Sequence, residues 1–170
     1  EVTESLIDTY RDLARGGVGL IITSYAFVTK RGKATTGKLG ADNNTLIPGL
    51  KSLTEAVHNE GGRVALQIVH GGSQLSFKTG MPTEAPSAVK ERATGNLPVE
   101  MSAGDIRRVT GEFAEAARRA KEAGFDSIEL HAAHGYLLSQ FLSPYSNIRT
   151  DEYGGSIENR ARIIFSIYKA

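Results

Sequence analysis

The segment of the sequence best suited to chemistry combines two histidines and a tyrosine within six residues. It reads HAAHGY from His131 to Tyr136 and directly follows a short apolar run. Two imidazole N–H groups directed at one point can bind a carbonyl oxygen or an anion, and they stabilise negative charge that develops there. A tyrosine, whose ordinary pKa is ~10, is protonated at neutral pH and can donate a proton to a carbanion-like centre. The segment therefore contains the parts of a site that binds an oxygen and protonates a nearby carbon.

Two other interpretations of these histidines are open. Imidazoles bind metals, but the zinc-protease helix needs a glutamate after its first histidine and a second histidine four residues on. Here two alanines separate the histidines and the chain has no cysteine. A metal-dependent barrel hydrolase using His70, His131 and His134 is thus the weaker functional alternative. Hydrogen-bonded histidines at a buried strand end, with Tyr136 in the core, are the structural alternative, and the residues alone do not decide against it.

Two nucleotide-binding motifs are absent or incomplete. Residues 32–39 read GKATTGKL, close to a phosphate-binding P-loop, but Leu39 stands where the magnesium-binding hydroxyl is needed. No strand leads into this segment and a poor helix start follows it, so we interpret it as a lysine-bearing loop. No G-x-G-x-x-G fingerprint follows an expected strand, which argues against a dinucleotide-binding Rossmann fold.

Apolar, β-rich runs alternate with helical patterns that end in glycine, so the elements around the HAAHGY segment can be predicted. The expected strands cover residues 18–23, 63–70 and 126–131. The expected helices cover residues 3–15, 48–59 and 102–123. Ser102 is expected to cap the third helix together with Asp105, in a shortened capping box.

Helices that alternate with strands predict an α/β fold with a parallel sheet. An open doubly wound sheet and a closed barrel both fit this pattern. In either fold the chemistry lies at the carboxyl ends of the strands, where HAAHGY is expected. In a barrel, Gln67 and His70 would face the same end. Residues 71–101 lack helical periodicity and contain three prolines, so we expect this long connection to have a task such as covering an active site.

The overall composition excludes several classes of protein. The formal net charge is +1 and basic and acidic residues are interspersed, which argues against nucleic acid or an anionic membrane as partner. The absence of cysteine excludes disulfides, a thiolate nucleophile and cysteine-ligated metal sites within this chain. No apolar run is long enough to span a bilayer, and the acidic N-terminus is unlike a signal peptide. We expect a soluble, cytoplasmic protein.

Residues 131–163 closely resemble the NADH:flavin oxidoreductase family, whose namesake is old yellow enzyme. They read HAAHGYLLSQFLSPYSNIRTDEYGGSIENRARI, and the match is long and nearly continuous. Shorter stretches agree with it, namely GLIIT at 19–23, ALQIVHGG at 65–72, APSA at 85–88 and EMSAGDI at 100–106. The resemblance extends over essentially the whole chain.

The resemblance implies a TIM (β/α)₈ barrel that binds FMN at its C-terminal mouth and is reduced by NADH or NADPH. Gln67 is similar to the glutamine that hydrogen-bonds the pyrimidine edge of the flavin, and Tyr25 falls where a strand-end loop approaches the flavin. His131 and His134 resemble the pair that holds the substrate's carbonyl or carboxylate oxygen; many relatives have asparagine at the second place. Tyr136 resembles the proton donor. No metal ligand is implied.

By the same resemblance, the reaction is reduction of the C=C bond of an α,β-unsaturated carbonyl or carboxyl compound, a small-molecule enone or enoate. Hydride reaches the β-carbon from the flavin, and Tyr136 protonates the α-carbon. Ser156 is expected to cap a helix. A further set of residues is expected to hold the loop and helix start together: Arg149, Asp151, Glu158, Asn159 and Arg160.

The chain departs from the family pattern in two ways. After His70 the family often has Gly-Arg, whereas this chain has Gly71-Gly72-Ser73, so any contact made through that arginine is in doubt. The family's first strand and the second half of its barrel, with its phosphate site, are also missing. We therefore expect residues 1–170 to be the N-terminal half of a single FMN-binding barrel domain, truncated at both ends. The rival expectation is a folded fragment without activity in isolation. The family often forms homo-oligomers.

Overall fold

A parallel sheet lies at the centre of the computed structural model, which describes residues 1–76 and 80–170. Three strands pair in chain order, with β4 between β1 and β7. They are β1 (Leu20–Ile22), β4 (Arg63–Val69) and β7 (Ser127–Leu130). Two short strands, β2 (Ala26–Phe27) and β3 (Leu39–Gly40), extend the β1 side of the sheet, because β2 pairs with the end of β4 and β3 pairs with β2.

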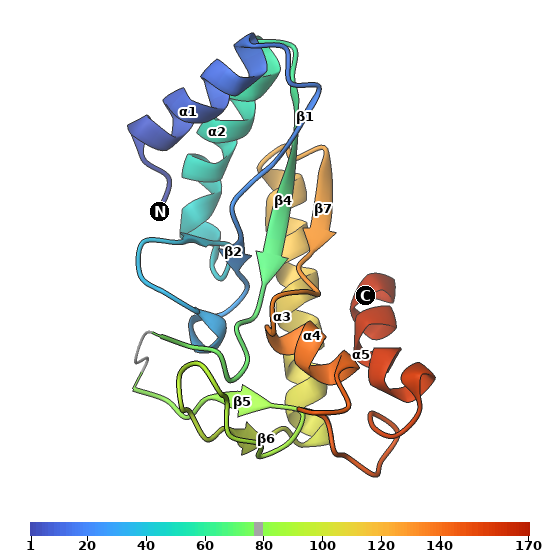
Figure 1. Cartoon of the computed structure of the whole chain (residues 1–170). Helices are drawn as coiled ribbons and strands as arrows, with labels where there is room; N and C mark the ends of the chain where they lie inside the picture. The colour runs from blue at the N-terminus through green and yellow to red at the C-terminus, as the bar shows by residue number, and fades with distance from the viewer. Residues whose placement is uncertain (77–79) are drawn as a thin grey trace.

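Helices join these strands and cover one face of the sheet (Figure 1). The α-helices are α1 (Glu4–Arg15), α2 (Ile47–Asn59), α3 (Ala103–Glu122), α4 (Leu137–Leu142) and α5 (Ile157–Lys169). Two 3₁₀ turns, η1 (Lys30–Gly32) and η2 (Asn44–Leu46), precede α2. A separate parallel pair, β5 (Glu84–Ala85) with β6 (Val99–Glu100), lies beyond the carboxyl end of β4. No helix among the described residues has both the length and the apolar character to cross a bilayer.

The helix starts and ends follow from local chemistry. Ser102 caps α3 by accepting from the Asp105 N–H, and the Asp105 carboxylate accepts from the Ser102 N–H, so the predicted capping box is confirmed. Ser156 caps α5 as predicted. The three predicted helices and three predicted strands are present with ends within two residues of those expected.

The two faces of the sheet differ in how they are covered. Val64, Leu66 and Ile68 of β4 are fully buried against the helices. On the opposite face, Leu20 is 53% exposed and Ile22 is 46% exposed. Parallel sheets are ordinarily buried on both faces. The face that carries Leu20 and Ile22 is therefore the side on which a closed barrel would have its interior.

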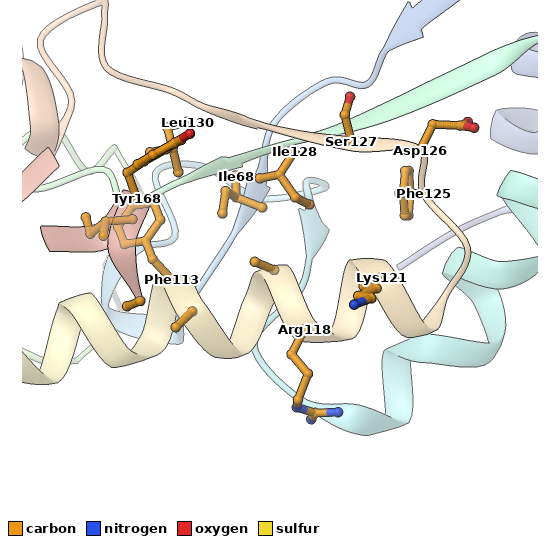
Figure 2. Close-up of a pocket in the computed structure, with 14 residues that line it drawn as sticks. Ile68, Phe113, Arg118, Lys121, Phe125, Asp126, Ser127, Ile128, Leu130 and Tyr168 are labelled. Carbon is orange, nitrogen blue, oxygen red and sulfur yellow. The ribbon is translucent and has the colours of Figure 1, made fainter. Parts of the chain in front are cut away.

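A groove of about 700 Å³ runs along the helix side of β7 (Figure 2). Figure 2 shows Ile128 and Leu130 of β7 facing α3, from which Phe113 and Arg118 project. The described strands pair only one edge of β7, the edge next to β4. A further strand and helix cover such an edge and groove in a closed barrel.

Arginine residues tie the loops after α4 to the rest of the molecule. The Arg149 guanidinium donates to the carbonyl oxygens of Pro86 (2.8 Å) and Met101 (2.6 Å) and pairs with Asp151. Arg160 donates to the carbonyl of Leu142 at 2.7 Å. These contacts agree with the predicted structural role of this stretch. The connection 71–101 is thus anchored beside α3 and α4; residues 77–79 of it lie outside the described part.

Candidate active site

The HAAHGY segment forms the turn between β7 and α4. His131 extends the sheet by one residue, because its N–H donates to the carbonyl of Ile68 at 3.0 Å. His134 and Gly135 then both adopt positive φ, 56° and 74°. His134 is the one described residue other than glycine in that region. Such backbone strain costs on the order of 1–3 kcal/mol and concentrates at functional sites.

Gln140, a buried residue in the middle of α4, stabilises this turn through hydrogen bonds. Its Nε2 donates to the carbonyl of Gly135 at 2.6 Å, and its Oε1 accepts from the Ser73 N–H at 3.2 Å. The Gln140 amide also fills the space next to Gly72, where φ is 63° and any Cβ would collide with it. An arginine at position 72 would be strained and would clash with Gln140. The departure from the family's Gly-Arg pattern thus has a physical cause in this chain.

His131 and His134 contact each other directly. His131 Nε2 lies 3.2 Å from His134 Nδ1, and the Ala133 N–H points at His131 Nδ1 at 3.3 Å. Since Nδ1 of His131 accepts, the neutral ring carries its proton on Nε2 and donates it to His134. His134 then keeps its Nε2–H as a donor. In this arrangement one ring donates to the other, and the Nε2–H of His134 is the donor that points away from the pair.

Burial and the neighbouring His134 lower the pKa of His131 below its usual 6.5. His131 is buried whereas His134 is exposed. A neutral imidazole at pH 7 is a hydrogen-bond donor rather than a cation. The pair can therefore donate to an oxygen without a permanent positive charge on the buried ring.

Tyr136 lies against the same rings. Its ring centroid is 5.0 Å from that of His131 and 5.6 Å from that of Tyr25, both edge to face. Burial and a hydrogen bond with Tyr25 raise the pKa of Tyr136 to about 12. The phenol therefore stays protonated throughout the neutral range. The structure thus brings four predicted site residues together: Tyr25, His131, His134 and Tyr136.

Gln67, the fifth predicted residue, lies on β4 in register with Glu129 of β7. Its Nε2 donates to the Glu129 carboxylate at 2.5 Å, and its backbone N–H donates to the buried hydroxyl of Thr23 at 3.2 Å. Gln67 is half-buried on the open face of the sheet. The bond to Nε2 leaves the amide oxygen of Gln67 to accept from a ligand, while Glu129 sets the orientation of the amide.

His70 is not part of this cluster. Its ring is buried against Gly32, where a Cβ would lie 2.5 Å from the ring, and its Nδ1 accepts from the Gly72 N–H at 3.0 Å. Burial, with Arg108 and Arg31 nearby, lowers the pKa of His70 to about 3. His70 lies at the carboxyl end of β4, the same end of the sheet as the cluster, but its buried ring packs against Gly32 rather than against the cluster residues. Across residues 1–76 and 80–170 no three metal-ligating side chains come together, so the three-histidine metal site finds no support.

Three residues near the cluster were not predicted. Gln140 and Glu129 position the turn and Gln67, as described above. Lys38 places its Nζ 4.8 Å from the centre of the Tyr25 ring. It comes from the P-loop-like segment, which forms a turn leading into β3 rather than into a helix. Only the pairing of β2 with β3 brings Lys38 to the site, and the sequence carries no signal for two-residue strands.

A family model described as "NADH:flavin oxidoreductase / NADH oxidase family" matches residues 1–170, the whole chain. The chain belongs to this family. The description of this family names NADH and a flavin, and FMN with NADH or NADPH is the cofactor pair of the family as a whole. The resemblance seen in the HAAHGY segment is therefore confirmed.

Curated relatives and solved structures agree with this family assignment. The chain is 46% identical over 158 residues to the NADPH dehydrogenase of Bacillus subtilis, covering 93% of this chain and 46% of the relative. It is 44% identical over 168 residues to the metal reductase of Desulforamulus reducens, covering 98% of this chain and 25% of the relative. The chain thus spans between a quarter and a half of the length of these curated relatives.

Among solved structures, morphinone reductase in complex with tetrahydroNAD superposes with a TM-score of 0.90 at 34% identity, over 99% of this chain and 51% of that one. Old yellow enzyme from Pichia sp. AKU4542 superposes with a TM-score of 0.91 at 32% identity, over 99% of this chain and 47% of that one. These matches decide between the two sheet architectures. The fold is part of a TIM barrel, and the open face of β1 is part of its interior.

The described residues fit a flavin in one respect. Gln67 offers an amide oxygen on the half-open face, with a carboxylate holding the amide in place. An amide can pair with the alternating donors and acceptors of a pyrimidine edge. Gln67 lies on this face toward the carboxyl end of β4. The His131 cluster lies at the same end of the sheet, and parallel barrels bind their ligands there.

Proposed function

We propose that the complete protein containing this chain uses NAD(P)H and FMN to reduce the C=C bond of α,β-unsaturated carbonyl or carboxyl compounds. The observation that supports this most is the contact between His131, His134 and Tyr136 at the carboxyl end of β7. Two oxygen-binding donors and one proton donor are what such a reaction requires from side chains.

The two histidines are proposed to bind the substrate oxygen. An incoming carbonyl or carboxylate oxygen takes the place of His134 Nδ1 as acceptor of the His131 proton, and it accepts a second hydrogen bond from the exposed His134 ring. Both donors become stronger partners as negative charge grows on that oxygen, which lowers the barrier rather than only tightening binding.

Tyr136 is proposed to protonate the α-carbon. When bound, FMN would supply the hydride for the β-carbon. The raised pKa of Tyr136 keeps the phenol protonated until a basic carbon appears beside it. Gln67 is proposed to hold the flavin through its amide, and the backbone around Tyr25 to approach the flavin.

The test is anaerobic reduction of 2-cyclohexenone and of an α,β-unsaturated carboxylate by the complete protein with NADH and NADPH. The expected result is NAD(P)H oxidation matched by formation of the saturated product. A flavin-loaded protein that oxidises NAD(P)H with quinones or oxygen but reduces no enone or enoate would exclude the proposed substrate class.

Residues 1–170 are proposed to be the N-terminal half of a single FMN-binding barrel domain, inactive in isolation. Leu20 and Ile22 of the barrel's interior are more than two-fifths exposed in this chain. A flavin held between strands from both halves loses part of its site when one half is absent.

A further inference from the structure

Tyr25 lies between the proposed proton donor and a cation. Its ring is 5.6 Å from that of Tyr136 at 69°, and the neighbouring Tyr25 phenol, together with burial, raises the pKa of Tyr136. On the other side the ammonium of Lys38 lies 4.8 Å from the centre of the Tyr25 ring. Tyr25 and Lys38 are both half-buried.

The strand pairing keeps this arrangement in register. Ala26 of β2 pairs with Leu39 of β3, so the preceding residues, Tyr25 and Lys38, are also neighbours across the two strands. The chain before Tyr25 is held by a bond from the Ser24 N–H to the Tyr10 hydroxyl at 3.0 Å. The backbone structure therefore places these two residues beside each other.

We propose that Tyr25 is a proton-supplying residue that acts through Tyr136, and that Lys38 stabilises the negative charge that passes through it. This inference rests on the function proposed above. When the O–H bond of Tyr136 breaks and its proton goes to the substrate carbon, a phenolate remains at Tyr136. Tyr25 donates its hydrogen bond to this phenolate and then transfers the proton. The phenolate left at Tyr25 recovers a proton from water.

The charges around the two phenols favour proton transfer from Tyr25 to Tyr136. Lys38 lies against the Tyr25 ring, and the attraction between its ammonium and that ring grows when the phenol loses its proton. Within residues 1–76 and 80–170, the other titratable side chain in ring contact with the phenols is that of His131, which in turn contacts His134. His131 is neutral at pH 7 because burial lowers its pKa, so Lys38 is the cation placed to stabilise the phenolate of Tyr25.

The chain offers a matched control for Lys38. Lys33, from the same loop, places its Nζ 5.2 Å from the centre of the Phe27 ring. Phenylalanine has no hydroxyl and cannot carry a proton. Lys38→Gln and Lys33→Gln therefore remove the same type of contact with and without a titratable ring.

Stopped-flow absorbance of the complete, flavin-loaded protein gives the first test. Tyr25→Phe is expected to slow flavin reoxidation by an enone by about tenfold, within the range of general acid catalysis, with a changed solvent isotope effect. Tyr25→Phe is expected to slow reduction by NAD(P)H less than it slows reoxidation. Lys38→Gln is expected to act in the same direction, and Lys33→Gln to leave both rates unchanged. Equal rates in Tyr25→Phe, Lys38→Gln and the unmodified protein would overturn the proposal.

The second test does not depend on turnover. In protein labelled with ¹³C at tyrosine Cζ, Tyr136→Phe assigns the Tyr136 signal. Tyr25→Phe is then expected to move the titration of that signal down from about 12 toward the ordinary ~10. An unchanged titration would show that the phenols are not coupled and would overturn the relay even where an enone is reduced. If Tyr25→Phe moves the Tyr136 titration but no enone reoxidises the flavin, the proposed function is wrong, whereas the coupling between the two phenols is supported.

Discussion

His131 and His134 satisfy each other's hydrogen-bonding groups in the structure. The Nε2 proton of His131 is given to His134, so neither buried nitrogen is left without a partner. An unpaired buried donor costs about 1–3 kcal/mol, and the contact between the rings avoids that cost. The exposed position of His134 lets this ring move when an oxygen competes for the His131 proton.

Substitution of the histidines tests this exchange of partners. His131→Ala and His134→Ala are each expected to weaken binding of a phenol, measured by calorimetry on the flavin-loaded protein, by about tenfold, because a hydrogen bond to a charged oxygen contributes about 1.5–3 kcal/mol. His134→Asn keeps an N–H donor at the second place and is expected to restore most of the affinity. Unchanged affinity in both alanine variants would contradict the assignment.

At this scale the sequence predicted which three side chains of the turn lie together in the structure. His131, His134 and Tyr136 lie within six residues, so a single turn brings them together. Gln140 was not predicted because a buried glutamine in a helix has no distinguishing pattern. Lys38 lay in a segment interpreted as a loop, and its contact with Tyr25 depends on two chain segments that only the folded structure places side by side.

At the scale of elements, the Asp126 carboxylate connects α2, β4 and the start of β7 at the amino ends of the strands. Its carboxylate accepts from the Val64 N–H at 2.8 Å, from Arg63 at 2.9 Å, and contacts His58 at 2.8 Å. Burial alone would raise the pKa of Asp126, but the bonds from Val64, His58 and Arg63 hold it at about 2. A depressed pKa contributes stability above the unfolded value of 3.8 that is lost as pH falls toward 2.

Asp126→Asn is therefore expected to lower the free energy of unfolding at pH 7 by about 1–2 kcal/mol, after allowance for solvent screening at this partly exposed carboxylate. Urea denaturation of the complete protein at pH 7 and at pH 2.5 measures the effect. The difference between variant and parent should shrink at the lower pH. A difference that is equal at both pH values would mean that packing rather than charge is responsible.

Gln140 connects α4 to the turn that carries His134. Gln140→Leu removes the bonds to Gly135 and Ser73 while keeping a similar volume. It is expected to lower kcat for enone reduction by about tenfold, because small displacements of catalytic groups are costly, and Gln140→Glu, which keeps the acceptor for Ser73, is expected to recover part of that loss. Equal Michaelis parameters in the leucine variant would show that the turn holds its shape without the amide.

The longer elements were predictable because their periodicity and glycine ends are local signals. The six-residue helix α4 and the two-residue strands were not predicted, since segments this short carry too few apolar repeats. The predicted capping by Ser102 and Ser156 was confirmed, as capping depends on residues three apart in the sequence.

At the scale of the whole molecule, the pattern of helices and strands left a barrel and an open sheet equally possible. The difference lies in how the far strands close, which residues 1–170 do not determine. The exposed Leu20 and Ile22 on one face of the sheet, together with superposition on about half of old yellow enzyme, show that this chain is part of a barrel.

The isolated chain is expected to bind FMN weakly or not at all. Purified residues 1–170 mixed with FMN and passed through a desalting column should elute without flavin absorbance near 450 nm, and the complete protein treated in the same way should remain yellow. A yellow 170-residue chain with stoichiometric flavin would contradict the proposal that the second half of the barrel is required.

The most direct measurement of the central claim separates the two half-reactions in the Tyr136→Phe variant of the complete protein. Stopped-flow absorbance follows flavin reduction by NAD(P)H and then reoxidation by an enone. The account predicts an unchanged first rate and a second rate lower by about 10²-fold or more, the scale of a lost general acid. Equal losses in both half-reactions, or no loss in the second, would show that Tyr136 is not the proton donor.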